Sequence, residues 1–344
     1  MEDVQESLAQ TKYVVTKQLG QGAYGTVYAA TQSETKTSVA IKSVDLCMEL
    51  YGINVSVLRE SAVLRSLKHP GIVELLDIVQ SGNKMMFILE LCGGGTLRSF
   101  VNGFESRGGL RPLPWDQLRQ FTRQLVEAVA YMHGCRIAHR DIKPDNIVLH
   151  GSYTVKLCDF GMARVVRTSL VPNDMSIQDD SNFTYTTKCT TLGFRPPELI
   201  MEAKNYDPYS VDRWGLGCVI AEMVQLRQLV CDKSEVFALQ HIFQLLGTPT
   251  ETTWPGVSML KGLESTRIWP QRTARLIFSS MWVFVPPDVM TVMDRMLRVV
   301  PYKRMTVSQA LKLMKKTADD EWEKAESLYQ RKERSINKRR RILY

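Results

Sequence analysis

Three oxygen-bearing side chains stand in two short motifs near the middle of the chain. The first motif runs from His139 to Asn146 and contains Asp141, and the second is Asp159-Phe160-Gly161. Asn146 and Asp159 offer the hard oxygen ligands that Mg²⁺ prefers, while Asp141 would be left to orient a hydroxyl group. These residue types at this spacing indicate a site for phosphoryl transfer.

The sequence between the two motifs predicts how they meet. Ile147-Val148-Leu149 and residues 153–158 are short runs typical of strands, and His150-Gly151-Ser152 between them is a turn signal. A hairpin here returns the second motif to the first. We therefore expect the three oxygen-bearing side chains to share one small site.

A glycine-rich segment lies near the N-terminal end of the chain. Gly20-Gln21-Gly22-Ala23-Tyr24-Gly25 separates a predicted strand that ends at Leu19 from a second predicted strand at 26–30. A strand after the glycines, in place of a helix, argues against a dinucleotide-binding turn. Glycines in a β-turn let backbone amides approach phosphates, and Val27 would cover a purine.

Lys42 is an isolated cation in the apolar run Val39-Ala40-Ile41-Lys42. A lysine on an edge strand is one interpretation. The next helix favours another, because Glu60 shares a face with four apolar residues at helical spacing. Burying an unpaired carboxylate is costly, so we predict that Glu60 pairs with Lys42. The apolar residues of that face are Ile53, Val57, Leu64 and Leu67.

Together these motifs resemble those of the eukaryotic protein kinases. The match extends from about Tyr13 to about Leu313, and details such as Leu246-Gly247-Thr248-Pro249 resemble the cyclin-dependent kinases of the CMGC group. The resemblance implies an α+β, two-lobed fold with a small β-rich N-lobe and a larger helical C-lobe. The expected divisions are an N-terminal extension (1–12), the N-lobe (13–90), a hinge (91–95), the C-lobe (96–317) and a basic tail (318–344).

The resemblance also implies catalytic roles. Asp141 would position a Ser or Thr hydroxyl of a protein substrate and accept its proton. Lys143 would touch the γ-phosphate of ATP, and Lys42, fixed by Glu60, would bind the α- and β-phosphates. The basis for a Ser/Thr preference is Lys143.

Metal and nucleotide contacts follow from the same resemblance. Asn146 and Asp159 would hold Mg²⁺, and backbone groups of Glu90 and Cys92 in the hinge would bind adenine. The other nucleotide contacts would come from Leu19, Gly20, Gln21, Gly22, Ala23, Tyr24, Gly25, Val27, Ala40, Lys42 and Val148.

Regulatory positions can be matched to the family as well. Tyr24 corresponds to an inhibitory phosphorylation site, and Thr186, twelve residues before Glu198, to the activating one, although Thr184 and Thr187 compete with it. A phosphate at Thr186 would be bound by a clamp of three arginines. These are Arg59, Arg140 and Arg164.

The residues expected to contact a regulatory partner and the substrate match the family less closely. The helix that bears Glu60 resembles the cyclin-contacting helix, which implies a cyclin-like regulatory subunit. Arg195 corresponds to an arginine that strains its loop and turns a backbone carbonyl away from the substrate, so that proline after the phosphorylated residue is preferred. Gly193 and Pro196 depart from the family, which has Trp and Ala there, and Gly93-Gly94-Gly95 departs from the cyclin-dependent pattern and indicates a flexible link.

Several C-lobe residues are expected to be structural. Residues 115–133 should form an amphipathic helix, and Ser210 should cap a buried helix over 211–225. His139 is interpreted as a buried structural histidine and Asp212 as an anchor, and the resemblance implies that Arg304 is the buried partner of Glu198.

Two other functions are weighed against this one. A mitogen-activated kinase would have tyrosine two residues after Thr186, where Lys188 stands. A pseudokinase scaffold would lack one of Lys42, Asp141 and Asp159, and all three are present.

Composition narrows the remaining classes. The chain has 344 residues, 44% apolar, which suffices for a sizeable core. It shows no leader-like start, no apolar run long enough to span a bilayer and, among seven cysteines, no Cys-x-x-Cys pair that would indicate structural zinc. We expect an intracellular protein, cytoplasmic, nuclear or both, with no membrane contact and no specific nucleic acid partner.

The net charge of +8 reflects a basic C-terminal tail. A solvated, partly helical end, a nuclear-targeting signal and weak binding to an acidic partner are all compatible with it. Its cations are Arg331, Lys332, Arg334, Lys338, Arg339, Arg340 and Arg341.

Overall fold

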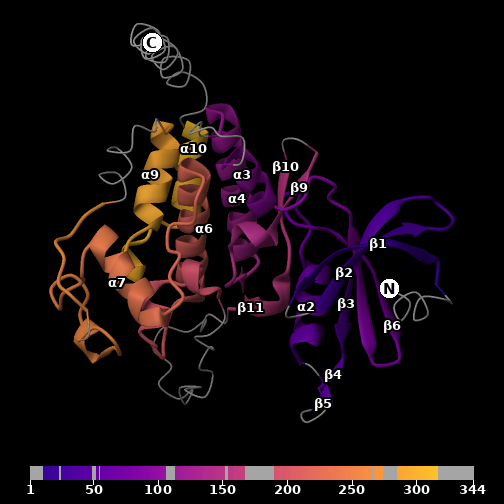
Figure 1. The fold of residues 1–344 in the computed structure, drawn as a ribbon, viewed down its shortest axis with the longest axis horizontal. Helices are drawn as coiled ribbons and strands as arrows, with labels where there is room; N and C mark the ends of the chain where they lie inside the picture. Colours follow the sequence, from indigo (N-terminus) through magenta and orange to yellow (C-terminus); the bar gives the residue numbers. More distant parts are fainter. Residues whose placement is uncertain are drawn as a thin grey trace, which may run out of the picture.

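The fold has a β-rich part and a larger helical part (Figure 1). The structure is a computed structural model, and it describes residues 11–22, 25–48, 52–53, 55–105, 113–151, 154–166, 190–264, 266–273 and 285–316. The predicted α+β, two-lobed class is confirmed. In the described parts of the chain, no helix is long and apolar enough to cross a membrane.

A five-stranded antiparallel sheet forms the N-terminal part, in the order β1-β2-β3-β7-β6. Its central strand β3 has six consecutive buried residues, because both faces of the sheet are covered there. Val39 and Ile41 pack with Tyr28 in a small cluster on one face, while Val44 joins the main core on the other. The strands are β1 (Tyr13–Gly22), β2 (Gly25–Gln32), β3 (Ser38–Asp45), β6 (Leu75–Ser81) and β7 (Lys84–Glu90).

The helix α2 (Val55–Ser66) packs against this sheet through the predicted apolar face. Val57, Leu64 and Glu60 are all buried. Ile53 was expected on the same helical face, but it lies before the helix in β5 (Gly52–Ile53), where it pairs with β4 (Cys47–Met48). The helix therefore begins only after this short β-bridge.

The helical part is built around α6 (Pro208–Gln225), which is buried on nearly all sides. The predicted amphipathic helix is α4 (Trp115–Gly134). Ser210 does not cap α6: the helix begins two residues earlier, with Asp207 accepting a hydrogen bond from the Tyr209 amide at 2.9 Å. Pro208 starts the helix well because its φ is already helical and it has no N–H to satisfy. The other helices are α3 (Leu97–Glu105), α5 (Pro197–Ile200), α7 (Glu235–Leu246), α9 (Pro287–Met296) and α10 (Val307–Lys316).

Short strands join the two parts. The predicted hairpin is present as β9 (Ile147–His150) and β10 (Thr154–Leu157), paired antiparallel, and β8 (Ile137–Ala138) pairs with β11 (Arg164–Val165). One continuous apolar core runs from Leu64 on α2 through Phe160 to Trp214 on α6. The site between the parts is therefore supported by packing from both.

A buried ion pair fixes the helix α5, which contains Glu198, to this core. Arg304 donates to both carboxylate oxygens of Glu198 at 2.6 and 2.7 Å, as the sequence predicted. It also donates to the backbone and hydroxyl oxygens of Ser210 at 3.0 and 2.9 Å and lies over the ring of Trp214. Ser210 thus serves as a partner of Arg304 within α6.

Replacing Arg304 with methionine should strongly destabilise the protein. The change leaves the Glu198 carboxylate buried without its cation, so we expect the free energy of unfolding to fall by about 3–5 kcal/mol. Arg298→Met is the matched control, because Arg298 forms a more exposed pair with Asp294, and its loss should cost at most about 1 kcal/mol. Urea unfolding measures both, and equal losses would contradict the assignment.

Candidate active site

Lys42 joins the two parts of the fold. Its Nζ lies 2.6 Å from Oε1 of Glu60 on α2 and 2.7 Å from Oδ1 of Asp159, which follows β10. Lys42 and Glu60 are buried. The predicted pair is present, and its ammonium is shared with a second carboxylate that the sequence did not assign to it.

The charges of Lys42, Glu60 and Asp159 follow from their burial and from the contact of Lys42 with both carboxylates. Burial alone would lower the pKa of Lys42, but Glu60 and Asp159 raise it above its ordinary value, so the ammonium stays charged. Burial alone would raise the pKa of Asp159. The positive charge of Lys42 has the larger effect and holds that pKa below its usual range. Burial and the charge of Asp159 raise the pKa of Glu60. Asp159 therefore remains an anion able to bind a cation.

The loop before Asp141 is held by the buried carboxylate of Asp212. Its two oxygens accept hydrogen bonds from the backbone amides of His139 at 2.9 Å and Arg140 at 2.6 Å. Arg140 has φ 66°, an uncommon value for a side-chain-bearing residue, and these bonds stabilise it. His139 is fully buried with its ring 4.8 Å from that of Phe160, which agrees with a structural role.

Asp141 lies at the centre of four polar contacts. Lys143 Nζ and Asn146 Nδ2 donate to its Oδ2 at 2.8 and 3.0 Å, and the Thr191 amide donates to Oδ1 at 3.2 Å. Lys143 Nζ also reaches the Thr191 hydroxyl at 2.7 Å. The carboxylate is thereby fixed in one orientation, with Asn146 Nδ2 bonded as well to the Asp141 carbonyl at 3.0 Å.

The oxygen donors of the site suit a hard cation. The amide nitrogen of Asn146 is used by Asp141, so its carbonyl oxygen is the atom left for a metal ion. Asp159 has φ 61° and supplies a carboxylate at the start of the turn that buries Phe160. An amide oxygen beside a carboxylate is a donor set that Mg²⁺ accepts.

Comparison with known proteins agrees with this geometry. Residues 13–314 match the protein kinase domain family. The chain is 34% identical over 296 residues to cyclin-dependent kinase 1 of Encephalitozoon cuniculi (strain GB-M1), covering 86% of this chain and 93% of that protein. It is 34% identical over 295 residues to cell division control protein 2 homolog 3 of Trypanosoma brucei brucei, covering 85% and 88%. The chain belongs to the cyclin-dependent-like protein kinases of the CMGC group.

The glycine segment of this kinase continues the first two strands. Gly20 and Gly22 belong to β1, and a Cβ at either would meet nothing within 4 Å, so the space beside them is open. Gly25 has φ 136°, and a Cβ there would lie 2.1 Å from the carbonyl oxygen of Ser43. Only glycine fits at that position. Ala23 and Tyr24 lie outside the described residues.

The other residues expected around a nucleotide lie on four different strands. Val27 lies opposite Lys42 in the ladder between β2 and β3, and Ala40 lies opposite Leu89 of β7. Val148 on β9 forms a bridge with Thr96, just after the hinge. Leu19 is on β1 beside Gly20-Gln21-Gly22.

Glu90 is the last residue of β7, and Cys92 follows it in the segment that is expected from its sequence to be a hinge. The Glu90 carboxylate accepts hydrogen bonds from Lys156 Nζ at 2.6 Å and from the Glu74 amide at 2.8 Å, and the Glu90 backbone N–H donates to the Glu74 carbonyl at 3.0 Å. Burial, aided by the charge of Glu90, raises the pKa of the Cys92 thiol to about 11. The thiol is therefore protonated at neutral pH.

Two of the three predicted clamp arginines interact electrostatically. Arg140 is fully buried and donates to the Met162 carbonyl at 2.9 Å and the Tyr206 hydroxyl at 3.0 Å. Burial and the charge of Arg140 lower the pKa of Arg59. Arg164 lies on β11, which pairs with β8 just before the catalytic loop. Thr186, with Thr184 and Thr187, lies outside the described residues.

Gly193 stands where the family has tryptophan, and the surrounding residues leave no space for a side chain there. A Cβ there would lie 1.7 Å from Nε2 of Gln228 and 2.5 Å from the Val230 carbonyl oxygen. The space that a larger residue would occupy is taken by Gln228, whose amide donates to that carbonyl at 2.8 Å.

Arg195 contacts the backbone of the segment before it. Its Nε and Nη2 donate to the Thr190 carbonyl at 3.2 and 2.8 Å, and its Nη1 lies 2.6 Å from Glu235. The strain expected in this loop is not found at Thr191, which has the ordinary extended values φ −60° and ψ 134°. The Thr190 carbonyl is nevertheless engaged by Arg195.

Sequence reasoning missed two contacts near Asp141. The contact of the Thr191 amide with Asp141 was not predicted from the sequence. Arg98 on α3 pairs with the buried Glu222 of α6 and, at 3.3 Å, with Asp145 beside Asn146. No local pattern indicates that pairing, because the three residues are far apart in the chain.

Removing Arg59 should stabilise the unphosphorylated kinase. Arg59→Met keeps an apolar stem but removes a cation that Arg140 disfavours, so the free energy of unfolding should rise by roughly 0.2–1 kcal/mol at low salt. The gain should shrink as salt screens the repulsion. Arg65→Met, an exposed position on the same helix, is the control and should change little. Urea unfolding of dephosphorylated protein tests this, and a loss of stability specific to Arg59→Met would contradict it.

Proposed function

We propose that this kinase transfers the γ-phosphoryl group of Mg²⁺-bound ATP to Ser or Thr hydroxyls of protein substrates. The observation that carries the proposal is the orientation of Asp141, whose two carboxylate oxygens accept from Lys143, Asn146 and Thr191. A carboxylate fixed in this way can orient an incoming hydroxyl and receive its proton.

The other charged groups would stabilise phosphate. Lys42, placed by Glu60, would bind the α- and β-phosphates, and Lys143, next to Asp141, would neutralise charge on the group in transfer. Asn146 and Asp159 would hold Mg²⁺, which neutralises phosphate charge when bound. The preference for Ser and Thr is supported by Lys143 and by its contact with the Thr191 hydroxyl.

The proposed nucleotide site lies between the lobes, which we place at residues 13–90 and 96–317 with a hinge at 91–95. Glu90 and Cys92 would bind adenine through their backbones. The glycine segment, including Ala23 and Tyr24, would cover the phosphates, and the apolar residues Val27, Ala40 and Val148 would enclose the base. The ends of the chain, 1–12 and 318–344, would lie outside the catalytic unit.

A regulatory partner is proposed on α2. The relatives of this chain include a kinase named as cyclin-dependent, and Leu58 on α2 has 45% of its surface exposed between Val57 and Arg59. A cyclin-like subunit could cover that leucine and fix the helix that carries Glu60.

Phosphorylation would complete this control. At Thr186 a phosphate would bring about −1.5 to −2 of charge to Arg59, Arg140 and Arg164, with charge-assisted bonds of roughly 1.5–3 kcal/mol each. At Tyr24 the same charge would repel the ATP phosphates. Thr186 would therefore activate and Tyr24 would inhibit.

Asp141→Asn should abolish most of the transfer. The amide keeps the shape of the side chain but cannot accept the substrate proton, so kcat should fall by about 10²–10⁴-fold with the KM for ATP nearly unchanged. Asp232→Asn, a surface change beside His241, is the control. Initial rates on a Ser/Thr peptide mixture with Mg²⁺, and with Mg²⁺ chelated, measure this. Undiminished transfer by Asp141→Asn would rule the assignment out.

Substrates should carry proline after the phosphorylated residue. Arg195 engages the Thr190 carbonyl, so a substrate amide at that point would find no acceptor, and proline has no amide hydrogen to leave unpaired. An unpaired amide costs about 1–3 kcal/mol, so kcat/KM should favour proline over alanine by about tenfold to a hundredfold.

Two protein variants and one modified peptide test whether the contact of Arg195 with the Thr190 carbonyl causes the preference for proline. Arg195→Met should reduce the preference, whereas Glu235→Gln, which weakens the other partner of Arg195, should retain it. A peptide with N-methylalanine in place of proline should be accepted almost as well, because it also lacks the amide hydrogen. Equal rates for alanine and proline peptides with the parent kinase would exclude the mechanism.

A further inference from the structure

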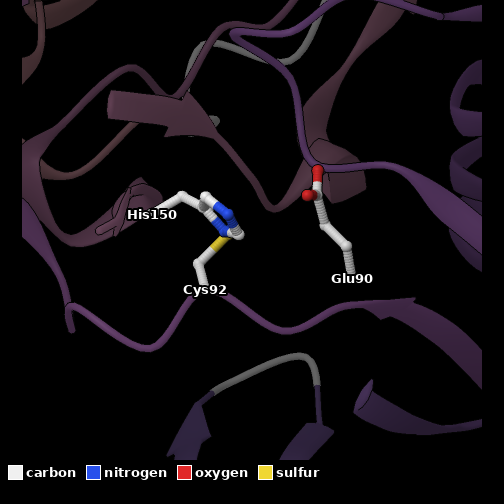
Figure 2. A group of neighbouring side chains, drawn as sticks. All are labelled: Glu90, Cys92 and His150. Carbon is white, nitrogen blue, oxygen red and sulfur yellow. The ribbon is translucent and has the colours of Figure 1, made fainter. Parts of the chain in front are cut away.

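Three potential metal ligands meet where the hinge contacts β9. The ligand atoms of Glu90, Cys92 and His150 all lie within 4.8 Å of one another. Figure 2 shows the imidazole of His150 beside the sulfur of Cys92, with the Glu90 carboxylate across from them. Among the residues that the structure describes, no other three Cys, His, Asp or Glu side chains gather this closely.

We propose that Glu90, Cys92 and His150 form a binding site for a zinc ion, with water as the fourth ligand. A thiolate, an imidazole and a carboxylate are ligands that zinc accepts, whereas Mg²⁺ and Ca²⁺ avoid sulfur. Zinc binding would release the proton of the Cys92 thiol to solvent and so produce the thiolate ligand. Tetrahedral zinc with its usual bond lengths sets its ligand atoms about 3.4–3.6 Å apart. The three ligand atoms, all within 4.8 Å of one another, are already close to that separation.

The backbone beneath the site is already in place. Gly94 donates to the Leu149 carbonyl and Leu149 donates to the Gly95 carbonyl, both at 2.9 Å, so the hinge is bonded directly to β9. His150 is paired with Thr154 at the end of that strand. Cys92 and His150 are thus anchored on segments that hold each other in register.

The glycines of the hinge make this contact possible. A Cβ at Gly94 would lie 2.8 Å from both the Cβ and the carbonyl oxygen of Leu149. The run Gly93-Gly94-Gly95, expected to be a flexible link, therefore lets the hinge approach β9 closely. The same departure from the cyclin-dependent pattern brings Cys92 to His150.

Glu90 is oriented by its own partners. Lys156 Nζ and the Glu74 amide donate to Oε1, which leaves Oε2 to face a metal ion. Hydrogen bonds of this kind to a ligating carboxylate fix its position. Lys156 also brings a positive charge, which the two anionic ligands offset. The site is open to solvent through the exposed His150, so an ion has a path to it.

Cobalt titration of the full-length kinase tests the site. Co²⁺ bound to a thiolate gives a sulfur-to-metal absorption band in the near ultraviolet, and excess Mg²⁺ would occupy the oxygen ligands of Asn146 and Asp159. We expect one equivalent of Co²⁺ to develop the band and one equivalent of Zn²⁺ to displace it. Because the readout is an absorption of sulfur, it is independent of phosphoryl transfer.

Substitution of the proposed ligands tests whether they bind the Co²⁺ that gives rise to the absorption band. Cys92→Ser should remove it, and His150→Asn, at an exposed position that leaves the fold intact, should weaken Co²⁺ binding at least tenfold. Cys231→Ser is the matched control: this exposed cysteine stands next to Asp232, which holds His241, but it does not gather with them. Absence of the band in the parent kinase, its persistence in Cys92→Ser, or unchanged affinity in His150→Asn would each overturn the proposal.

Discussion

One buried ammonium group, that of Lys42, holds together segments that are far apart in the chain. It comes from the central strand of the sheet and contacts Glu60 on α2 and Asp159 after β10 at 2.6 and 2.7 Å. Charges taken out of water must be paired and hydrogen-bonded, so the buried carboxylate of Glu60 is not stable as an anion here without it. A movement of α2 therefore changes the charge balance at Asp159 as well. This connects the proposed partner surface around Leu58 to the proposed metal ligand.

The opposite wall of the site depends on a second buried charge. Asp212 binds the backbone of His139 and Arg140 and belongs to α6, the most deeply buried helix. The catalytic loop is thus attached to the core of the helical part, while Lys42 is attached to the sheet. Asp141 is held by residues near it in sequence and by Thr191, so it takes its position from the C-terminal side alone. Relative movement of the two sides would alter the approach of phosphate to Asp141 without disturbing Asp141 itself.

Patterns of local spacing predicted most of the fold and the catalytic contacts. The Lys42–Glu60 pair and the β9–β10 hairpin were predicted from helical periodicity and from a turn signal, and both are present. The Arg304–Glu198 pair is also present, and it was predicted from the resemblance to the kinase family. The start of α6 was predicted at residue 211, but the helix begins at Pro208. Asp207 and Pro208 were visible in the sequence as a possible cap and first-turn residue. Contacts such as Arg98 with Glu222 were not predictable, since they depend on how α3 and α6 pack.

Departures from the family pattern have reasons that only the packed structure supplies. At Gly193 the missing side chain is replaced in space by Gln228, and at Gly94 the missing Cβ admits the backbone of β9. In both cases glycine is required by close approach of another segment, with ordinary turn conformation playing no part. A glycine that reads as flexible in sequence is then one of the most constrained positions in the molecule. Such a contact fixes the hinge against β9 beside Glu90 and Cys92, so the lobes must adjust their separation elsewhere than at Gly94.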